Sequence, residues 1–282
     1  MRIFLIIAML VFSLQAKSLF SNNNQAEASE YIAALKDLIV ATQRCRGATG
    51  SYLNGNEIAI DLVYNYRSDM RKAIATMESL PMSQNPMINS KATAVSEALT
   101  DFNSKALDLS SAESFNGYTV SLAKALTLAK TVSKQFTDLN DFGNEAVNLM
   151  LEVILPLSEN MGQLRALGSG ASARAKNDKK QIAQMKSILR NIESLNSSLQ
   201  SKSIDILSRY KDAYSTDLSS RLSTADRAVR DYVSLTRKEI LLDKVNYSSS
   251  EYFRTATSAV DDVIIIFDIN RKAILKDSDG WI

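Results

Sequence analysis

Apolar residues recur every three or four positions through almost the whole chain of 282 residues. One such series is Ile182, Met185, Leu189, Ile192, Leu195 and Leu199, and similar series begin at Leu218 and Tyr252. This spacing places the apolar side chains along one face of an α-helix. No stretch shows the strict apolar–polar alternation between hairpin turns that strands of a sheet would show. The pattern therefore predicts an all-α protein.

Breaker residues divide this pattern into about eight helices. We expect the first helix from about Glu27 to the Asn54-Gly55-Asn56 turn, the second to end at a Pro81–Pro86 loop, the third at Asn116-Gly117 and the fourth between Asn140 and Gly143. The fifth should run from about Glu145 to the Gly168–Gly170 region, with a kink at Pro156. The sixth is expected over 177–210 and the seventh over 216–244, and the eighth should start at a Ser248–Glu251 capping box. Helices of this length suggest two four-helix bundles in one elongated domain over residues 17–282.

The N-terminus has the pattern of a targeting segment. Met1 and Arg2 precede an uninterrupted apolar run over Ile3–Leu14. A helix needs about 20 residues to cross a bilayer, so this run fits the apolar region of a signal peptide better than a membrane span. Residues 1–16 are expected to be the signal peptide, with cleavage after Ala16 or alternatively after Ser18. We therefore expect an exported, periplasmic protein; an uncleaved membrane anchor is the alternative.

Composition excludes several function classes. The chain has no His and one Cys, so His-based triads, His-ligated zinc or haem, thiolate clusters and internal disulfides are impossible, and no cofactor or metal is expected. Two acidic pairs remain, Asp261-Asp262 and Asp277 with Asp279, but neighbouring residues on a helix point in different directions. An enzyme is therefore not expected. With a formal net charge of +2, the chain also lacks the concentrated basic face typical of nucleic-acid binding.

Six of the nine glycines lie in two short windows, Gly47–Gly55 and Gly162–Gly170. Both windows fall in helical patterns, where a glycine costs about 1 kcal/mol relative to alanine, so they require a reason. In each of the two regions an arginine, Arg46 or Arg165, is followed by small residues. By helical spacing, Gln43, Gly47 and Gly50 share a face with Arg46. Gly168 and Ser169 share a face with Arg165 in the same way.

Two interpretations of these windows are open. In the first, small residues only allow helix backbones to approach each other, and the arginines reach surface carboxylates. In the second, small side chains leave a hollow between helices into which both guanidinium groups point, and a small bound oxyanion neutralises them. Nitrate, nitrite, bicarbonate and small carboxylates all fit that description, and the residues alone do not choose among them.

At these windows the sequence resembles a known family. Residues Leu38–Leu53, with Gln43, Arg46 and Gly47, are similar to the first-helix signature of the nitrate- and nitrite-sensing (NIT) family; 161–170 resembles its second arginine motif, and 251–261 its closing helix. The resemblance implies an all-helical sensor of two hinged four-helix bundles that binds nitrate or nitrite near their junction. It makes Arg46 and Arg165 the primary ligand residues, with Arg44, Gln43, Gly50, Gly168 and Ser169 secondary.

Two departures from the family pattern affect this expectation. Cys45 stands where the family usually has Glu, which could alter anion preference. Family members normally carry an output module, such as a kinase, a chemoreceptor signalling region or an antiterminator, and none follows here before Trp281-Ile282. The resemblance then implies that a ligand-driven population shift between bundle arrangements is passed to a separate, unidentified receptor or signalling protein. Exposed helix faces permit a homodimer without requiring one. The alternative is an exported helical-bundle interaction or scaffold protein with no small-molecule ligand.

Overall fold

The computed structural model describes residues 2–136, 139–214 and 217–278, with side chains over residues 25–276 of these ranges. The described residues form helices and loops, with no β-strand among them. The elements are α1 (Arg2–Leu53), α2 (Ala59–Ser79), η1 (Pro81–Gln84), α3 (Pro86–Lys105), α4 (Ser111–Ser133), α5 (Asp141–Leu149), η2 (Met150–Ile154), α6 (Leu155–Arg174), α7 (Lys179–Arg209), η3 (Lys211–Ala213), α8 (Leu218–Leu235), η4 (Thr236–Ile240) and α9 (Ser249–Ser278). Because α5, η2 and α6 are continuous, these ranges hold eight long helices, which confirms the predicted all-α class.

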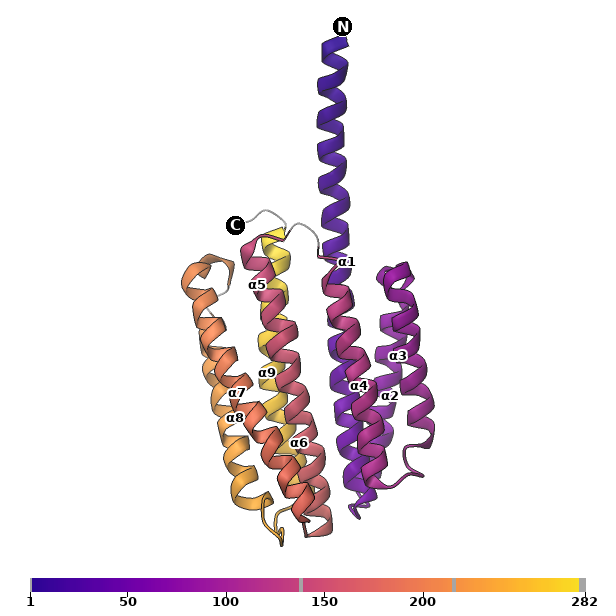
Figure 1. Ribbon diagram of the computed structural model, residues 1–282, viewed down its shortest axis with the longest axis vertical. Coiled ribbons are helices and arrows are strands. Elements are labelled where there is room, and N and C mark those ends of the chain that lie inside the picture. The colour runs from indigo at the N-terminus through magenta and orange to yellow at the C-terminus, as the bar shows by residue number, and fades with distance from the viewer. Residues whose placement is uncertain (1, 137–138, 215–216, 279–282) are drawn as a thin grey trace.

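The long helices form two bundles side by side (Figure 1). Helices α1 to α4 make the first bundle, and α5–α6, α7, α8 and α9 make the second. Helix α1 also packs against α6 and α9, so it belongs to the core of the first bundle and to the junction with the second. The predicted pair of four-helix bundles is therefore present, and α1 and α6 are the helices that join them.

Local chemistry explains several helix starts. Ser110 and Glu113 form a capping box at the start of α4, in which each side chain accepts a hydrogen bond from the other residue's backbone N–H. Asn140 caps α5 by accepting from the backbone N–H of Gly143, at the break that the sequence predicts there. At the predicted box before α9, the Ser248 hydroxyl accepts from the Glu251 N–H at 3.3 Å.

The predicted break at Asn116-Gly117 is wrong, because both residues lie inside α4. The chain leaves α3 at Lys105 and turns before Ser110 instead. Gly117 serves packing rather than a turn: a Cβ atom there would lie 2.0 Å from Cε2 of the Phe102 ring. The missing side chain therefore lets α3 and α4 pack closely.

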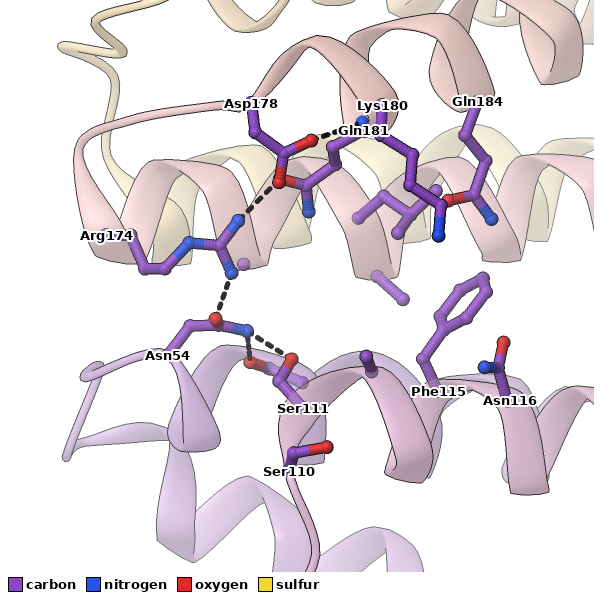
Figure 2. Close-up of a pocket in the computed structure, with 15 residues that line it drawn as sticks. Asn54, Ser110, Ser111, Phe115, Asn116, Arg174, Asp178, Lys180, Gln181 and Gln184 are labelled. Atoms are coloured by element: carbon purple, nitrogen blue, oxygen red, sulfur yellow. Dashed lines mark hydrogen bonds between the residues drawn. The ribbon is translucent and has the colours of Figure 1, made fainter.

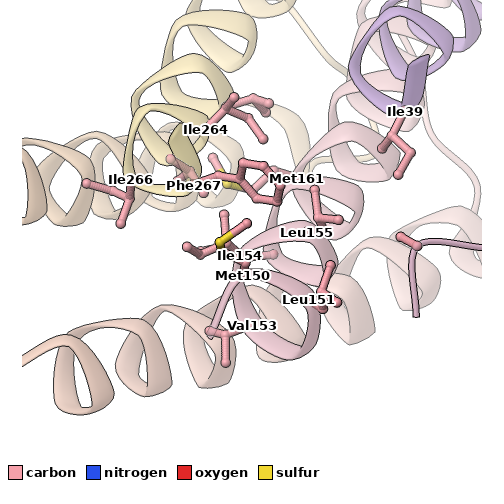
Figure 3. Close-up of a cluster of buried hydrophobic side chains, with 14 of the residues drawn as sticks. Ile39, Met150, Leu151, Val153, Ile154, Leu155, Met161, Ile264, Ile266 and Phe267 are labelled. Carbon is pink, nitrogen blue, oxygen red and sulfur yellow. The ribbon is translucent and has the colours of Figure 1, made fainter. Parts of the chain in front are cut away.

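Pro156 does not interrupt its helix. It lies in the first turn of α6, directly after the π-helical turn Met150–Ile154. The wider turn joins α5 to α6 without a loop, and the missing N–H of Pro156 falls next to it, where the regular α-helical hydrogen bonding is already interrupted. Apolar side chains around this turn pack against α9 and reach Ile39 of α1 (Figure 3). The hydrophobic core of the second bundle thus continues into the junction.

Helix α1 begins at Arg2 rather than near Glu27. Its N-terminal part projects beyond both bundles as a single helix (Figure 1). The two predicted cleavage positions, Ala16 and Ser18, both lie within α1. No helix in the described ranges is both long and apolar enough to cross a membrane.

The contact between α6 and α9 depends on Gly168. A Cβ atom at this position would lie 2.3 Å from Cε1 of Tyr252. The Tyr252 ring is fully buried, and its hydroxyl is 2.8 Å from the Thr236 hydroxyl and 3.2 Å from the Tyr232 hydroxyl. These contacts hold the ring in place, so it cannot move aside easily.

We predict that Gly168→Ala lowers the free energy of unfolding by about 1–3 kcal/mol, because overpacking against Tyr252 outweighs the better helix propensity of alanine. Gly50→Ala is the matched control, since a Cβ there would lie at an ordinary 3.7 Å from the Ala166 carbonyl oxygen. It should be neutral or stabilising by up to about 1 kcal/mol. Urea unfolding followed by circular dichroism measures both; equal effects would contradict the prediction.

Candidate functional site

Arg46 and Arg165 lie on the two facing helices of the junction. Arg46 comes from α1 and Arg165 from α6, and their exposed fractions are 1% and 0%. Each guanidinium lies against a glycine of the other helix. A Cβ at Gly162 would be 3.1 Å from Nη2 of Arg46, and one at Gly47 would be 3.4 Å from Nε of Arg165. The glycines therefore make room for two buried arginines at one helix interface.

Arg46 is already paired with a carboxylate. Its Nη1 donates to Oε1 of Glu159 at 2.7 Å and its Nη2 to Oε2 at 3.2 Å, which is a bidentate arrangement. Nη1 also donates to the Thr119 hydroxyl of α4 at 3.0 Å, and the guanidinium lies 5.4 Å from the centre of the Phe115 ring. Arg46 is thus neutralised and held by residues of both bundles.

Glu159 is a site residue that sequence analysis misses. It is 6% exposed, and its carboxylate also accepts from the amide of Gln43 at 3.1 Å and from that of Gln163 at 2.9 Å. Glu159 is far from Arg46 in sequence, and no motif connects the two. The one local signal is Gln163, one helical turn after Glu159 on the same face of α6.

Arg165 has no such counter-ion. Its Nη1 donates to the Thr257 hydroxyl at 2.8 Å, and its guanidinium lies 4.9 Å from the centre of the Phe253 ring. Within the described residues, its Nε and Nη2 atoms have no hydrogen-bond partner. Burial lowers the pKa of Arg165 to about 10, and the positive charges of Arg46 and Arg44 act in the same direction. The group is therefore still a cation at neutral pH, buried without compensation.

The buried cluster carries an excess of one positive charge. Arg46 and Glu159 cancel each other, which leaves the charge of Arg165. Arg44 lies to one side, partly exposed, and donates to Asp261 of α9 at 2.6 Å. One small monoanion would bring the cluster to neutrality, and a dianion would exceed it.

The other predicted residues lie at different distances from this cluster. Gln43 is fully buried and holds Glu159, so the structure brings it together with Arg46. Gly50 contacts the backbone of α6, and Gly168 lies under Tyr252 rather than against an arginine. Ser169 is one turn beyond Arg165 on α6; it is fully buried, and among the described residues its hydroxyl has no partner.

Cys45 faces away from the two arginines into the first bundle. Its Sγ is 3.3 Å from the Tyr118 hydroxyl and 3.8 Å from Oδ1 of Asn103. Burial raises the pKa of the thiol, which favours its neutral form. A carboxylate at this position would lie among residues of α2, α3 and α4, including Arg67 of α2, so the departure at Cys45 does not touch the cluster of Arg46 and Arg165 directly.

A cleft of about 720 Å³ opens between the bundles next to the cluster. It is lined by α1, α4, α6 and α7, and Arg174 lies at its edge, donating to Asn54 and, at 2.6 Å, to Gln181 (Figure 2). Phe115 points into this cleft and also contacts Arg46. Ala166, which follows Arg165 in α6, lines the cleft, whereas Arg46 and Arg165 do not, so the cleft lies beside the buried pair and meets it through Phe115.

The acidic pair Asp261-Asp262 lies on α9. Asp261 is engaged by Arg44, and Asp262 follows it on the same helix. The side chains of Asp277 and Asp279 lie outside the part of the chain that the structure describes.

Comparison with known proteins gives three findings. No curated protein matches the chain significantly. A solved structure, "Structure of the NasR transcription antiterminator", is similar in fold, with a TM-score of 0.69, 11% identity, and coverage of 97% of this chain and 74% of that chain. The family model described as nitrate and nitrite sensing (NIT) matches residues 37–268, a range that includes Arg46, Glu159 and Arg165. The chain therefore belongs to the nitrate- and nitrite-sensing (NIT) family.

Proposed function

We propose that this protein binds one nitrate or nitrite ion at Arg165, beside Arg46, and passes the resulting change in bundle arrangement to a separate signalling partner. The observation that carries the proposal is the buried guanidinium of Arg165, which has no counter-ion among the described residues. A buried unpaired cation is strongly unfavourable, and an anion relieves that cost.

The unsatisfied edge of Arg165 fits a planar oxyanion. Nε and Nη2 lie on one edge of the guanidinium, and their parallel N–H bonds match two oxygens of a flat anion. Phe253 lies against the guanidinium, and the single excess charge favours a monoanion over sulfate. The Ser169 hydroxyl, one turn away, is a further donor for the ligand.

Anion binding can be coupled to the arrangement of the two bundles because the residues of the cluster come from both of them. Arg46 and Thr119 belong to the first bundle, and Arg165 and Glu159 belong to the second. An anion that binds one relative arrangement of α1 and α6 more tightly shifts the population toward it, by as much as its affinities for the two arrangements differ. The junction is thus both the ligand site and the hinge.

We predict that isothermal titration calorimetry detects one nitrate or nitrite per chain, and that Arg165→Ala weakens binding by about 100-fold or more, because two charge-assisted hydrogen bonds are lost. Arg190→Ala, which removes an exposed arginine from α7, is the control and should bind normally. Absence of heat with both anions at millimolar concentration would refute the proposed function. Sulfate should give no specific heat.

In the ligand-free protein, replacing each arginine by methionine should affect the free energy of unfolding differently. Arg46→Met leaves Glu159 buried without its cation and should lower the free energy of unfolding by about 3–5 kcal/mol. Arg165→Met removes an uncompensated cation and should leave stability unchanged or raise it. Urea unfolding in a nitrate-free buffer measures both variants. A large loss of stability in Arg165→Met would show that its charge is compensated.

We also propose that the protein is exported. The apolar run before Ala16 lies in the projecting part of α1, so its removal would leave both bundles intact. Expression of the full chain in a Gram-negative host should give a periplasmic product whose N-terminal sequencing starts at Lys17 or Leu19. A product that stays in the cytoplasm with Arg2 retained would contradict this.

A further inference from the structure

The Glu159 carboxylate itself occupies an oxyanion site. It is flat, it is buried, and it accepts hydrogen bonds from Arg46, Gln43 and Gln163. These donors surround both oxygens, as a protein would surround a bound oxyanion. Both Nη atoms of Arg46 are therefore engaged by a side chain and its Nε alone lacks a partner in the described residues, whereas Arg165 offers both Nε and Nη2.

We propose that Glu159 is an internal competitor of the anion: its carboxylate holds Arg46 in the ligand-free protein and thereby limits how tightly nitrate or nitrite binds. This inference rests on the proposed function, since it concerns the same cluster. It assigns Glu159 the role of setting the affinity of the site rather than that of a ligand residue.

Charge and geometry give the direction of the effect. With Glu159 ionised, the cluster presents one excess positive charge to the anion; with a neutral side chain there, it presents two. A neutral side chain would also hold the Nη atoms of Arg46 less tightly than the Glu159 carboxylate does, so that they donate more readily to the ligand. Both changes strengthen anion binding. If Glu159 only positioned Arg46 for the ligand, its removal would weaken binding instead.

The same pair also links the two bundles. Glu159 belongs to α6, and its bidentate partner Arg46 belongs to α1 and is held by Thr119 of α4. An anion that draws Arg46 away from Glu159 thus breaks a buried contact between the bundles. In this way competition at the ligand site becomes a change at the junction, which is the differential interaction that a population shift requires.

The test compares the nitrate affinity of the wild-type protein with that of E159Q by calorimetry. E159Q keeps the shape of the side chain and should bind nitrate at least about tenfold more tightly. The control is E152Q, which removes a charge from the same continuous helix. Glu152 is exposed and pairs with Lys130 at 2.9 Å, so E152Q should bind like the wild type. Tighter binding by both variants to the same extent would reduce the effect to overall charge and overturn the proposal.

A second variant guards against misfolding. If E159Q does not give a folded protein, E159D retains the charge but shortens the reach to Arg46, and it should still bind nitrate more tightly than the wild type. Equal or weaker binding by the variant measured, when the wild type binds, overturns the competitor role alone. If neither the wild type nor a folded Glu159 variant binds nitrate or nitrite, the proposed function fails as well.

Discussion

The junction of the two bundles is governed by an imbalance of charge: two guanidinium groups are buried between α1 and α6, and among the described residues a buried carboxylate pairs with Arg46 but none pairs with Arg165. The rest of the interface accommodates this imbalance. Glycines at 47 and 162 provide the space, and aromatic rings of Phe115 and Phe253 lie against the cations. Such an interface is not the most stable one that these helices could form, since apolar residues would pack there without desolvating a charge. The cost is understandable if an ion from solution completes the cluster.

Much of the fold is predictable from local chemistry. The three- and four-residue spacing of apolar residues determines the helices, and the breaks at Pro81–Pro86 and Asn140 depend on residues that act on their own backbone. The predicted helix break at Gly117 is wrong because the role of this residue depends on a part of the chain outside its own helix. Its role is decided by the ring of Phe102 on another helix, and nothing in the neighbouring sequence reveals that contact. A glycine in a helical pattern is therefore ambiguous until its partner is known.

In the candidate site, too, the sequence reveals some residues and not others. Arg46 and Arg165 stand out in the sequence because each begins a run of small residues, and the structure places both at one interface. That placement leaves their role as ligand residues a prediction. Glu159 does not stand out, because it meets Arg46 across a separation of 113 residues. The direction of Cys45 is equally hidden: it adjoins Arg46 in the chain, yet it faces Tyr118 in the first bundle. Helical geometry sends consecutive side chains to different neighbours.

The length of α1 has a consequence of its own. Between Arg46 and Lys17, where the chain would begin after cleavage behind Ala16, the helix is continuous and spans about 44 Å at 1.5 Å per residue. If α1 tilts about the arginine cluster when an anion binds, as proposed, the helix serves as a lever arm. A tilt of one degree there displaces the distant tip by about 0.8 Å, so even a slight pivot is magnified far from the place where it starts.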